Sequence, residues 1–293
     1  MPSSRLPEPP VHLFLLTALV MTAFAANSLL NRAALADGLI DALPFALIRV
    51  VAGAVVLALL VREWPRAGRA QWGAAAALTA YLVGFSLAYV ALDAGIGALI
   101  LFGLVQVTML AGAVALGDRP ALRRWAGAAL AMVGLGALLL PGVDAVPDPV
   151  AAGLMALAAL GWGLYSLAGR GAARPLAMTA TNFTLAVPMV AALALPGLFS
   201  ASLTAPGVAL AVASGAVTSG LGYALWYRVL PALGAARAAV AQLSVPVIAL
   251  AGGVLVLGES LTWTGALASL VVLAGVALAI LPGRKSPAPP TGS

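Results

Sequence analysis

Aromatic and amide side chains recur at helical spacing inside long apolar stretches of this sequence. Tyr81 and Phe85 are four residues apart and Trp162 and Tyr165 are three apart, and residues at these spacings share one face of an α-helix. Aromatic faces stack on flat ligands, and amides can bond either end of a zwitterion. The pattern predicts binding of a small molecule by a set of eight residues, namely Asn27, Tyr81, Phe85, Gln106, Trp162, Tyr165, Tyr223 and Gln242.

The same residue types also have a structural interpretation. Tyrosine and tryptophan collect at membrane interfaces, where they anchor helix ends at headgroup level. Tyr89, Tyr227, Trp64 and Trp72 lie near the ends of apolar stretches and suit such a belt. Amides can instead bond one another between helices. We therefore expect the deeper rings to line a cavity, with the interfacial belt and interhelical bonding as alternatives.

Arg49 is the one charged residue near the middle of an apolar stretch. Its planar guanidinium suits a carboxylate, because two parallel hydrogen bonds can form. It could equally bond backbone carbonyls at a helix break and serve the fold. Both interpretations, substrate carboxylate and structure, stay open.

Groups that catalysis or cofactor binding would need are missing. The sequence has no cysteine and one histidine, His12, which excludes disulfides, thiol catalysis and thiolate metal sites. The serines within apolar stretches have no histidine to activate them. No phosphate-binding G-x-x-x-x-G-K-[ST] loop occurs, so the chain holds no ATP motor. We expect no enzyme activity, no metal and no cofactor.

Ten apolar stretches would carry these side chains. Hydrophobic residues make up 63% of the 293 residues and charged residues 8%, against about a quarter charged in soluble domains. Crossing a bilayer takes ~20 mainly apolar residues. The sequence therefore predicts an all-α membrane protein with ten transmembrane helices, near residues 11–33, 40–61, 71–91, 95–116, 122–141, 150–169, 175–199, 205–229, 233–256 and 260–281.

Charges between the stretches alternate in sign. Short loops rich in Lys and Arg stay cytoplasmic, which puts both termini in the cytoplasm. The net charge of +6 is thus a topology signal, and the dispersal of the basic residues argues against nucleic-acid binding. The acidic connections hold Asp37, Asp41, Asp93, Asp144, Asp148 and Glu259, with only Arg32 of opposite sign; the basic ones, with the termini, hold Arg5, Arg62, Arg66, Arg69, Arg119, Arg123, Arg124, Arg170, Arg174, Arg228, Arg237, Arg284 and Lys285.

The two halves of the chain resemble each other. A shift of 138 residues lays Ser28-Leu29 on Ser166-Leu167 and Arg32 on Arg170, and a further slip of about three lays Gly117-Asp118 on Gly258-Glu259. We expect a first five-helix repeat at 1–147, a second at 148–283 and a disordered tail at 284–293. Because five is odd, the second repeat would enter the membrane from the opposite side. Inverted repeats are typical of secondary transporters, with the binding site between the halves; a duplicated scaffold that transports nothing is the alternative.

The chain resembles a known family in several short motifs. Gly117-Asp118 and Gly258-Glu259 follow the fourth and ninth stretches, Arg49 lies in the second, and Pro246 lies in the ninth. With five-plus-five helices, these features resemble the drug/metabolite transporter superfamily, EamA type, although Asp118 stands where glutamate is usual. The aromatic residues of the third, sixth and eighth stretches are similar to those of aromatic amino acid exporters.

The resemblance implies a multi-pass transporter of the bacterial inner membrane that works as a monomer. We expect it to export amino acids, preferably aromatic ones, and related metabolites by alternating access through a cavity between spans one, three, four, six, eight and nine. No Asp or Glu lies deep in an apolar stretch, although proton-coupled carriers generally need a titrating group there. We therefore expect downhill or exchange-like transport. The alternatives are a proton-coupled exporter of drugs or other metabolites with the same fold, and a membrane scaffold.

Overall fold

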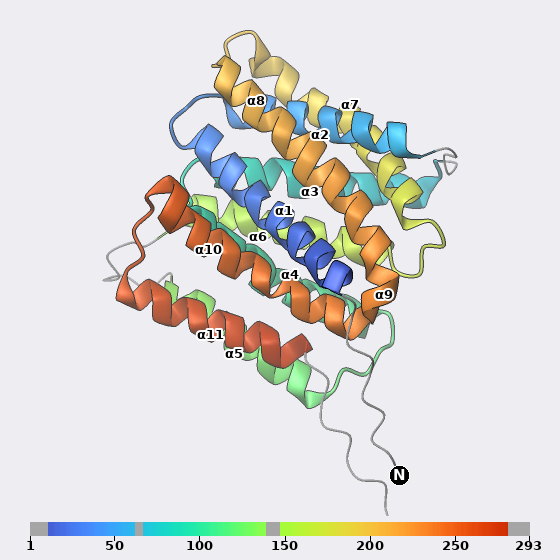
Figure 1. Ribbon diagram of the computed structural model, residues 1–293, viewed down its shortest axis with the longest axis vertical. Helices are drawn as coiled ribbons and strands as arrows, with labels where there is room; N and C mark the ends of the chain where they lie inside the picture. The colour runs from blue at the N-terminus through green and yellow to red at the C-terminus, as the bar shows by residue number, and fades with distance from the viewer. Residues whose placement is uncertain (1–10, 62–66, 139–146, 281–293) are drawn as a thin grey trace, which may run out of the picture.

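The computed structural model describes residues 11–61, 67–138 and 147–280, and these parts of the chain fold into a bundle of helices (Figure 1). One isolated antiparallel bridge joins Ile40 and Leu203. In chain order the helices are α1 (Val11–Leu35), α2 (Ala42–Leu60), α3 (Arg69–Ala88), α4 (Ala94–Ala115), α5 (Leu122–Leu138), α6 (Pro149–Ala168), α7 (Pro175–Leu198), α8 (Ala205–Ala213), the π-helix η1 (Ser214–Leu221), α9 (Gly222–Gln242), α10 (Ser244–Leu257) and α11 (Trp263–Ile280).

Helical segments occupy each of the ten predicted ranges. Within the described residues, eight segments are long and apolar enough to cross a membrane. The helices outside this set are α3 and α5, and for them the prediction of a span stays a prediction. The predicted tail at 284–293 lies outside the described residues.

Large apolar side chains lie on the outside of the bundle, and polar side chains are buried inside it. Large apolar side chains such as Phe14, Leu59 and Leu255 are 66%, 82% and 83% exposed, whereas Asn31 and Arg49 are fully buried. In a bilayer, apolar side chains contact lipid at no cost, while polar groups have to find partners inside the bundle. The described helices therefore form a multi-pass membrane protein.

Glycines allow the closest helix contacts. A Cβ at Gly127 would meet the backbone of Ala279, and a Cβ at Gly275 would meet the backbone of Ala131. These contacts hold α5 against α11 along their length. Small residues let backbones approach where bulk would separate them.

The helix that begins at α8 continues through η1 and α9 and breaks at Gly234. This glycine has φ of 69° and non-helical torsions, whereas Pro231 lies inside the helix. The prediction ended this span at residue 229, which is too early. Pro231 removes one helical hydrogen bond and can bend the helix. The helix nevertheless breaks at Gly234, because glycine tolerates a positive φ.

Connections gather at two opposite ends of the bundle (Figure 1). The α1–α2, α3–α4 and α10–α11 connections lie at the left of the view and the α7–α8 connection at its top. We call this the acidic end, because it carries Asp37, Asp41, Asp93 and Glu259. The α4–α5 and α6–α7 connections lie at the right, and we call this the basic end, because it carries Arg119, Arg170 and Arg174.

Candidate functional site

A cavity of about 50 Å³ lies inside the bundle, among α1, α3, α4, α6, η1 and α9. These helices fall in the ranges expected to enclose a central cavity. Six of the eight predicted binding residues line it: Asn27, Tyr81, Phe85, Trp162, Tyr223 and Gln242. Its remaining lining residues are Phe24, Ser28, Leu101, Phe102, Thr218 and Ser219.

Aromatic rings from four helices form one wall of the cavity. The ring of Trp162 lies 4.9 Å from that of Tyr81 and 5.7 Å from that of Tyr223, and it stacks on Tyr223 with an interplanar angle of 19°. Phe24 continues the row, 5.6 Å from Tyr223. Such centroid distances are typical of favourable aromatic pairs. The wall therefore offers flat apolar faces to a ligand.

Hydrogen bonds centred on Asn27 form the polar side of the cavity. Its Oδ1 accepts from Ser214 Oγ at 2.7 Å and from Thr218 Oγ1 at 3.1 Å. Its Nδ2 donates to the Tyr81 hydroxyl at 3.5 Å. Asn31 extends the network, donating to Asn27 O at 2.8 Å and accepting from Ser86 Oγ at 3.0 Å. The network joins α1, α3 and η1 in the interior of the bundle.

The π-helix η1 supplies the hydroxyls of this network. Ser214 and Thr218 both face Asn27, and Thr218 Oγ1 also bonds Ser214 O at 2.8 Å. Gly215 brings η1 directly onto α2, since a Cβ there would collide with the Arg49 carbonyl oxygen. π-Helices are rare in proteins, and those that occur frequently lie at functional sites.

Arg49 lies behind the aromatic wall and is fully buried. Its Nη2 donates to the Tyr81 hydroxyl at 3.0 Å, and its guanidinium carbon lies 5.3 Å from the Tyr81 ring centroid and 5.0 Å from that of Phe85. Its Nε and Nη1 have no hydrogen-bond partner in the part of the chain that the structure describes. The guanidinium thus contacts two rings that line the cavity, and Arg49 is not itself among the lining residues.

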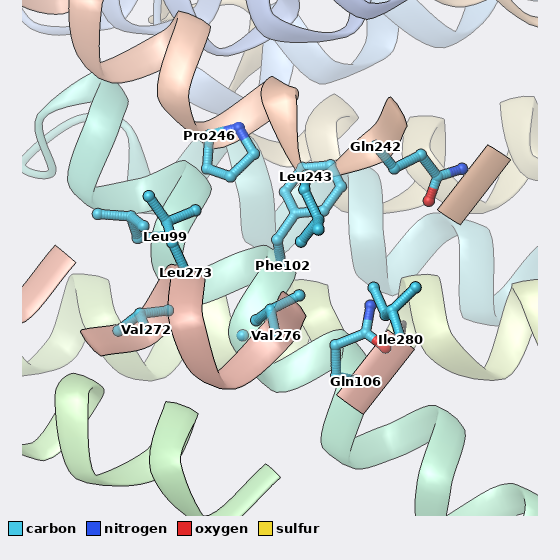
Figure 2. A pocket seen from close by; sticks show the side chains of 11 residues that line it. Leu99, Phe102, Gln106, Gln242, Leu243, Pro246, Val272, Leu273, Val276 and Ile280 are labelled. Carbon is cyan, nitrogen blue, oxygen red and sulfur yellow. The ribbon is translucent and has the colours of Figure 1, made fainter. Parts of the chain in front are cut away.

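Gln106 and Tyr165 are the two predicted binding residues outside this lining. Gln106 lies in a neighbouring crevice of about 10 Å³ between α4, α10 and α11, with Gln242 at the same crevice (Figure 2). Tyr165 contacts Trp162 with ring centroids 5.5 Å apart, and its hydroxyl donates to Thr179 at 3.1 Å. Tyr165 therefore packs against the Trp162 ring of the wall and does not itself line the cavity.

Tyr89 differs from its predicted place in an interfacial belt. It is fully buried, its ring covers Gly97, and its hydroxyl donates to Ala94 O at 3.1 Å. The belt prediction was wrong for this residue, because its helix end is covered by α4. Trp72 is 46% exposed, and Trp64 lies outside the described residues.

Charged groups connect three elements at the acidic end. Arg32 Nη2 lies 3.1 Å from Asp93 Oδ1, and Arg32 Nε lies 3.5 Å from Glu259 Oε1. Glu259 also accepts from Ala94 N, at 2.8 Å to Oε1 and 3.1 Å to Oε2, at the start of α4. Burial raises the pKa of Glu259, and the Ala94 amide and Arg32 oppose this shift. We call Arg32, Asp93, Ala94 and Glu259 the acidic-end tie.

An exposed ion pair lies at the basic end. Arg170 Nη2 is 3.4 Å from Asp118 Oδ2, and the two side chains are 51% and 52% exposed. The side chains of Arg32 and Glu259 are 20% and 9% exposed. Exposed pairs contribute little to stability, because water screens them. Water therefore screens the Arg32–Glu259 pair less than the Arg170–Asp118 pair.

The sequence left several lining residues unidentified. Leu101 and Phe102 carry no signal beyond an apolar stretch, so nothing marked them. Thr218 could have been found, because Ser214 and Thr218 are four residues apart in an otherwise apolar segment, a spacing that places both hydroxyls on one helical face.

Comparison with known proteins places the chain in a family. The sequence profile of the EamA-like transporter family matches residues 150–281. The chain is 49% identical over 271 residues to the uncharacterized protein PA1977 of Pseudomonas aeruginosa, covering 92% of this chain and 94% of that protein. A solved structure described only as the crystal structure of a protein shares the fold, with a TM-score of 0.64 at 18% identity, covering 92% of this chain and 98% of that one. The helical membrane fold, the match to the profile and the full-length relative together show that this chain belongs to the EamA-like transporter family.

Proposed function

We propose that this transporter exports amino acids, with a preference for aromatic ones, and related small metabolites. Family membership supports transport of small molecules and no enzyme activity. The observation that carries the choice of substrate is the cavity, where an aromatic wall faces amide and hydroxyl groups. A flat side chain can stack on the wall while its polar end bonds the opposite side.

Substrate entry requires the cavity wall to open. At about 50 Å³ the cavity has room for a few water molecules, since about 10–15 Å³ of such volume holds one water. Ligand pockets are typically ~300–1,000 Å³. Binding of an aromatic amino acid therefore needs the rings of Tyr81, Trp162 and Tyr223 to separate. This supports a carrier that closes around its substrate.

Two inverted five-helix repeats, 1–147 and 148–283, are the architecture that we propose for this movement, with ten spans. Helix contacts support it: α3 packs on α6 as α9 packs on α1, and α4 packs on α6 as α10 packs on α1. Under the shift of the two halves these pairs correspond. The family profile matches 150–281, which is close to the second unit alone.

The corresponding ion pairs at the two ends support alternating access. Arg32 corresponds to Arg170, and Glu259 to Asp118, in the alignment of the halves. The Arg32–Glu259 pair is largely buried in the acidic-end tie, whereas the Arg170–Asp118 pair is exposed. In alternating access by inverted repeats, the two halves exchange conformations. We propose that the acidic-end tie loosens when the basic-end pair becomes buried.

We propose that the acidic end faces the periplasm of a bacterial inner membrane, with both termini cytoplasmic and the chain acting as a monomer. The positive-inside rule supports this orientation, and the relative from Pseudomonas aeruginosa supports the bacterial location. Reporter fusions at each terminus test the orientation. Activity on opposite sides of the membrane would contradict an even number of spans.

Transport is proposed to be downhill or exchange-like. The acidic residues of the described chain lie in connections or at helix ends, and none lies inside a helix. A titrating carboxylate within the membrane is the usual device for proton coupling. Strong acceleration of substrate flux by an imposed pH gradient in proteoliposomes would contradict this proposal and favour a proton-coupled exporter.

Counterflow of labelled Phe, Trp, Thr and a cationic drug in proteoliposomes tests the substrate. We expect Phe and Trp to exchange fastest. Phe85→Ala and Trp162→Ala should slow Phe about tenfold and Thr much less, because each removes part of the stacking surface, worth ~1 kcal/mol or more. Trp72→Ala, at an exposed position, is the matched control.

Other results would change the assignment. Equal loss for Phe and Thr would assign the two rings to folding. Faster flux of the drug than of any amino acid would favour a drug exporter of the same fold. Absence of flux for every compound, with the protein folded, would favour a membrane scaffold.

A further inference from the structure

We propose that the cavity selects substrates by their carboxylate, with the Tyr81 hydroxyl as the donor to it and Arg49 as the residue that positions and charges this donor. The inference rests on the proposed function and names the substrate class of that site: small aromatic carboxylates, zwitterionic or anionic, in preference to amines.

Hydrogen bonding leaves the hydroxyl proton of Tyr81 for the cavity. The oxygen accepts from Arg49 Nη2 at 3.0 Å and from Asn27 Nδ2 at 3.5 Å. Arginine only donates. The Asn27 amide is oriented by Ser214 and Thr218, which both donate to its Oδ1. Both lone pairs of the Tyr81 oxygen are thus occupied.

Because its oxygen is saturated by donors, Tyr81 has to donate its own proton. No hydrogen bond donated by this hydroxyl is found in the described parts of the chain, and Tyr81 lines the cavity. A buried donor without an acceptor is costly, whereas a bond to a carboxylate is among the stronger hydrogen bonds. The unsatisfied donor therefore favours a ligand with an anionic oxygen.

The charge of Arg49 points to the same ligand. The guanidinium is fully buried, and every acidic residue of the described chain lies in a connection or at a helix end. The faces of the Tyr81 and Phe85 rings partly compensate the charge of the guanidinium. A ring face, however, attracts a cation much less than a carboxylate does. The cavity next to Tyr81 is therefore at positive potential, which attracts a carboxylate and repels an ammonium group.

A purely structural role for Arg49 lacks the bonds it would need. Such a role requires Arg49 to bond backbone carbonyls, yet the hydrogen bond recorded for its guanidinium goes to Tyr81, and Nε and Nη1 have no partner in residues 11–61, 67–138 and 147–280. The side chain thus acts on the hydroxyl that faces the cavity. With a carboxylate at Tyr81, the ring of a ligand would extend toward Trp162, whose ring lies 4.9 Å from that of Tyr81.

Three ligands that share a phenyl ring separate the charges: 3-phenylpropionate carries only the carboxylate, phenethylamine only the ammonium, and phenylalanine both. Their binding to the purified full-length protein can be followed by tryptophan fluorescence, because Trp162 lines the cavity. We expect 3-phenylpropionate to bind the wild type at least tenfold more tightly than phenethylamine. Equal affinities, or no binding of 3-phenylpropionate, would overturn the proposal.

Substitutions then assign the residues. Tyr81→Phe, which keeps the ring, and Arg49→Met should each weaken 3-phenylpropionate about tenfold or more and leave phenethylamine unchanged or tighter. Arg49→Lys should restore most of the affinity, because it keeps the charge. Tyr227→Phe is the matched control, since it removes a hydroxyl that contacts Thr179 and does not line the cavity.

Each remaining outcome decides the question. Equal weakening of both ligands in Tyr81→Phe would mean that the hydroxyl serves the fold alone, and this variant is mild enough to be read even if Arg49→Met does not fold. Selective carboxylate binding without phenylalanine flux would leave this inference standing and reject the exporter. Phenylalanine flux with no carboxylate preference would reject this inference and leave the proposed exporter standing.

Discussion

Asn27 bonds three side chains from two other elements in the interior of the bundle. Its Oδ1 receives the Ser214 and Thr218 hydroxyls and its Nδ2 reaches Tyr81. At the level of single residues, this makes Asn27 the point where the binding site and the fold are joined, because losing its amide leaves the buried Ser214 hydroxyl without its acceptor.

Asn27→Ala should therefore lower stability by ~1 kcal/mol, within the range measured for side-chain hydrogen bonds in membranes. Thermal unfolding in detergent measures the effect, and we expect a drop of a few degrees. Thr184→Ala is the control, because its hydroxyl bonds only Ala180 O of its own helix. An equal drop in both variants would show that Asn27 contributes nothing beyond a local contact.

Sequence alone identified how deep the binding residues lie but not all of their directions. Trp162 and Tyr223 were placed in one cavity because depth can be counted along an apolar stretch. Gln106 has the same depth, yet it lies in the neighbouring crevice with α11. Which side of a helix faces the cavity depends on the helices packed around it, and these are distant in sequence.

At the scale of elements, the π-helix η1 joins α1 to α2. Its hydroxyls face Asn27, and Gly215 lies directly on the Arg49 carbonyl. A side chain at this glycine would push η1 away from α2 and move Ser214 out of register with Asn27.

Gly215→Ala should consequently abolish or strongly reduce substrate counterflow and lower the unfolding temperature. Gly222→Ala is the matched control, since its added methyl would meet the Phe24 ring at 3.5 Å and the Val217 carbonyl oxygen at 3.6 Å, both ordinary contacts. Both variants are compared by counterflow and by thermal unfolding. Tolerance of alanine at Gly215 would show that the close approach of η1 and α2 has no role in transport.

The lengths of the apolar stretches predicted the positions of the helices well. They did not predict where the helices are irregular. The predicted first span at 11–33 agrees with α1 at Val11–Leu35, because twenty apolar residues have few alternatives in a bilayer. The π-helix has the same composition as an α-helix, so no residue pattern marked it. The break at Gly234 was misplaced because its cause is one backbone torsion.

At the scale of the whole molecule, the acidic-end tie makes closure sensitive to pH. Burial raises the pKa of Glu259 in the closed arrangement, with Asp93 adding to the rise and Arg32 opposing it. When this end opens, water reaches the carboxyl group and its pKa falls toward the ordinary value. The closed form then binds the proton more tightly, so acid stabilises closure and rising pH weakens it.

Labelling of a single cysteine tests this dependence, and the natural absence of cysteine removes background. With Ser28→Cys in the cavity lining, an impermeant thiol reagent added from the acidic end should react a few-fold faster at mildly alkaline than at acidic pH, relative to the same cysteine in Glu259→Gln. The ratio cancels the pH dependence of thiolate formation, because both proteins carry the same cysteine. A ratio that stays constant with pH would exclude Glu259 as the titrating group.

The α1–α2 and α7–α8 connections are joined by backbone hydrogen bonds: Asp41 N donates to Ser202 O at 3.1 Å, and Thr204 N donates to Leu39 O at 3.0 Å. Backbone pairing of this kind tolerates little relative sliding. We therefore expect the four helices that these connections join to move together at this end. In the proposed transport cycle, α4 and α10, which are held at this end through side chains, would move relative to them.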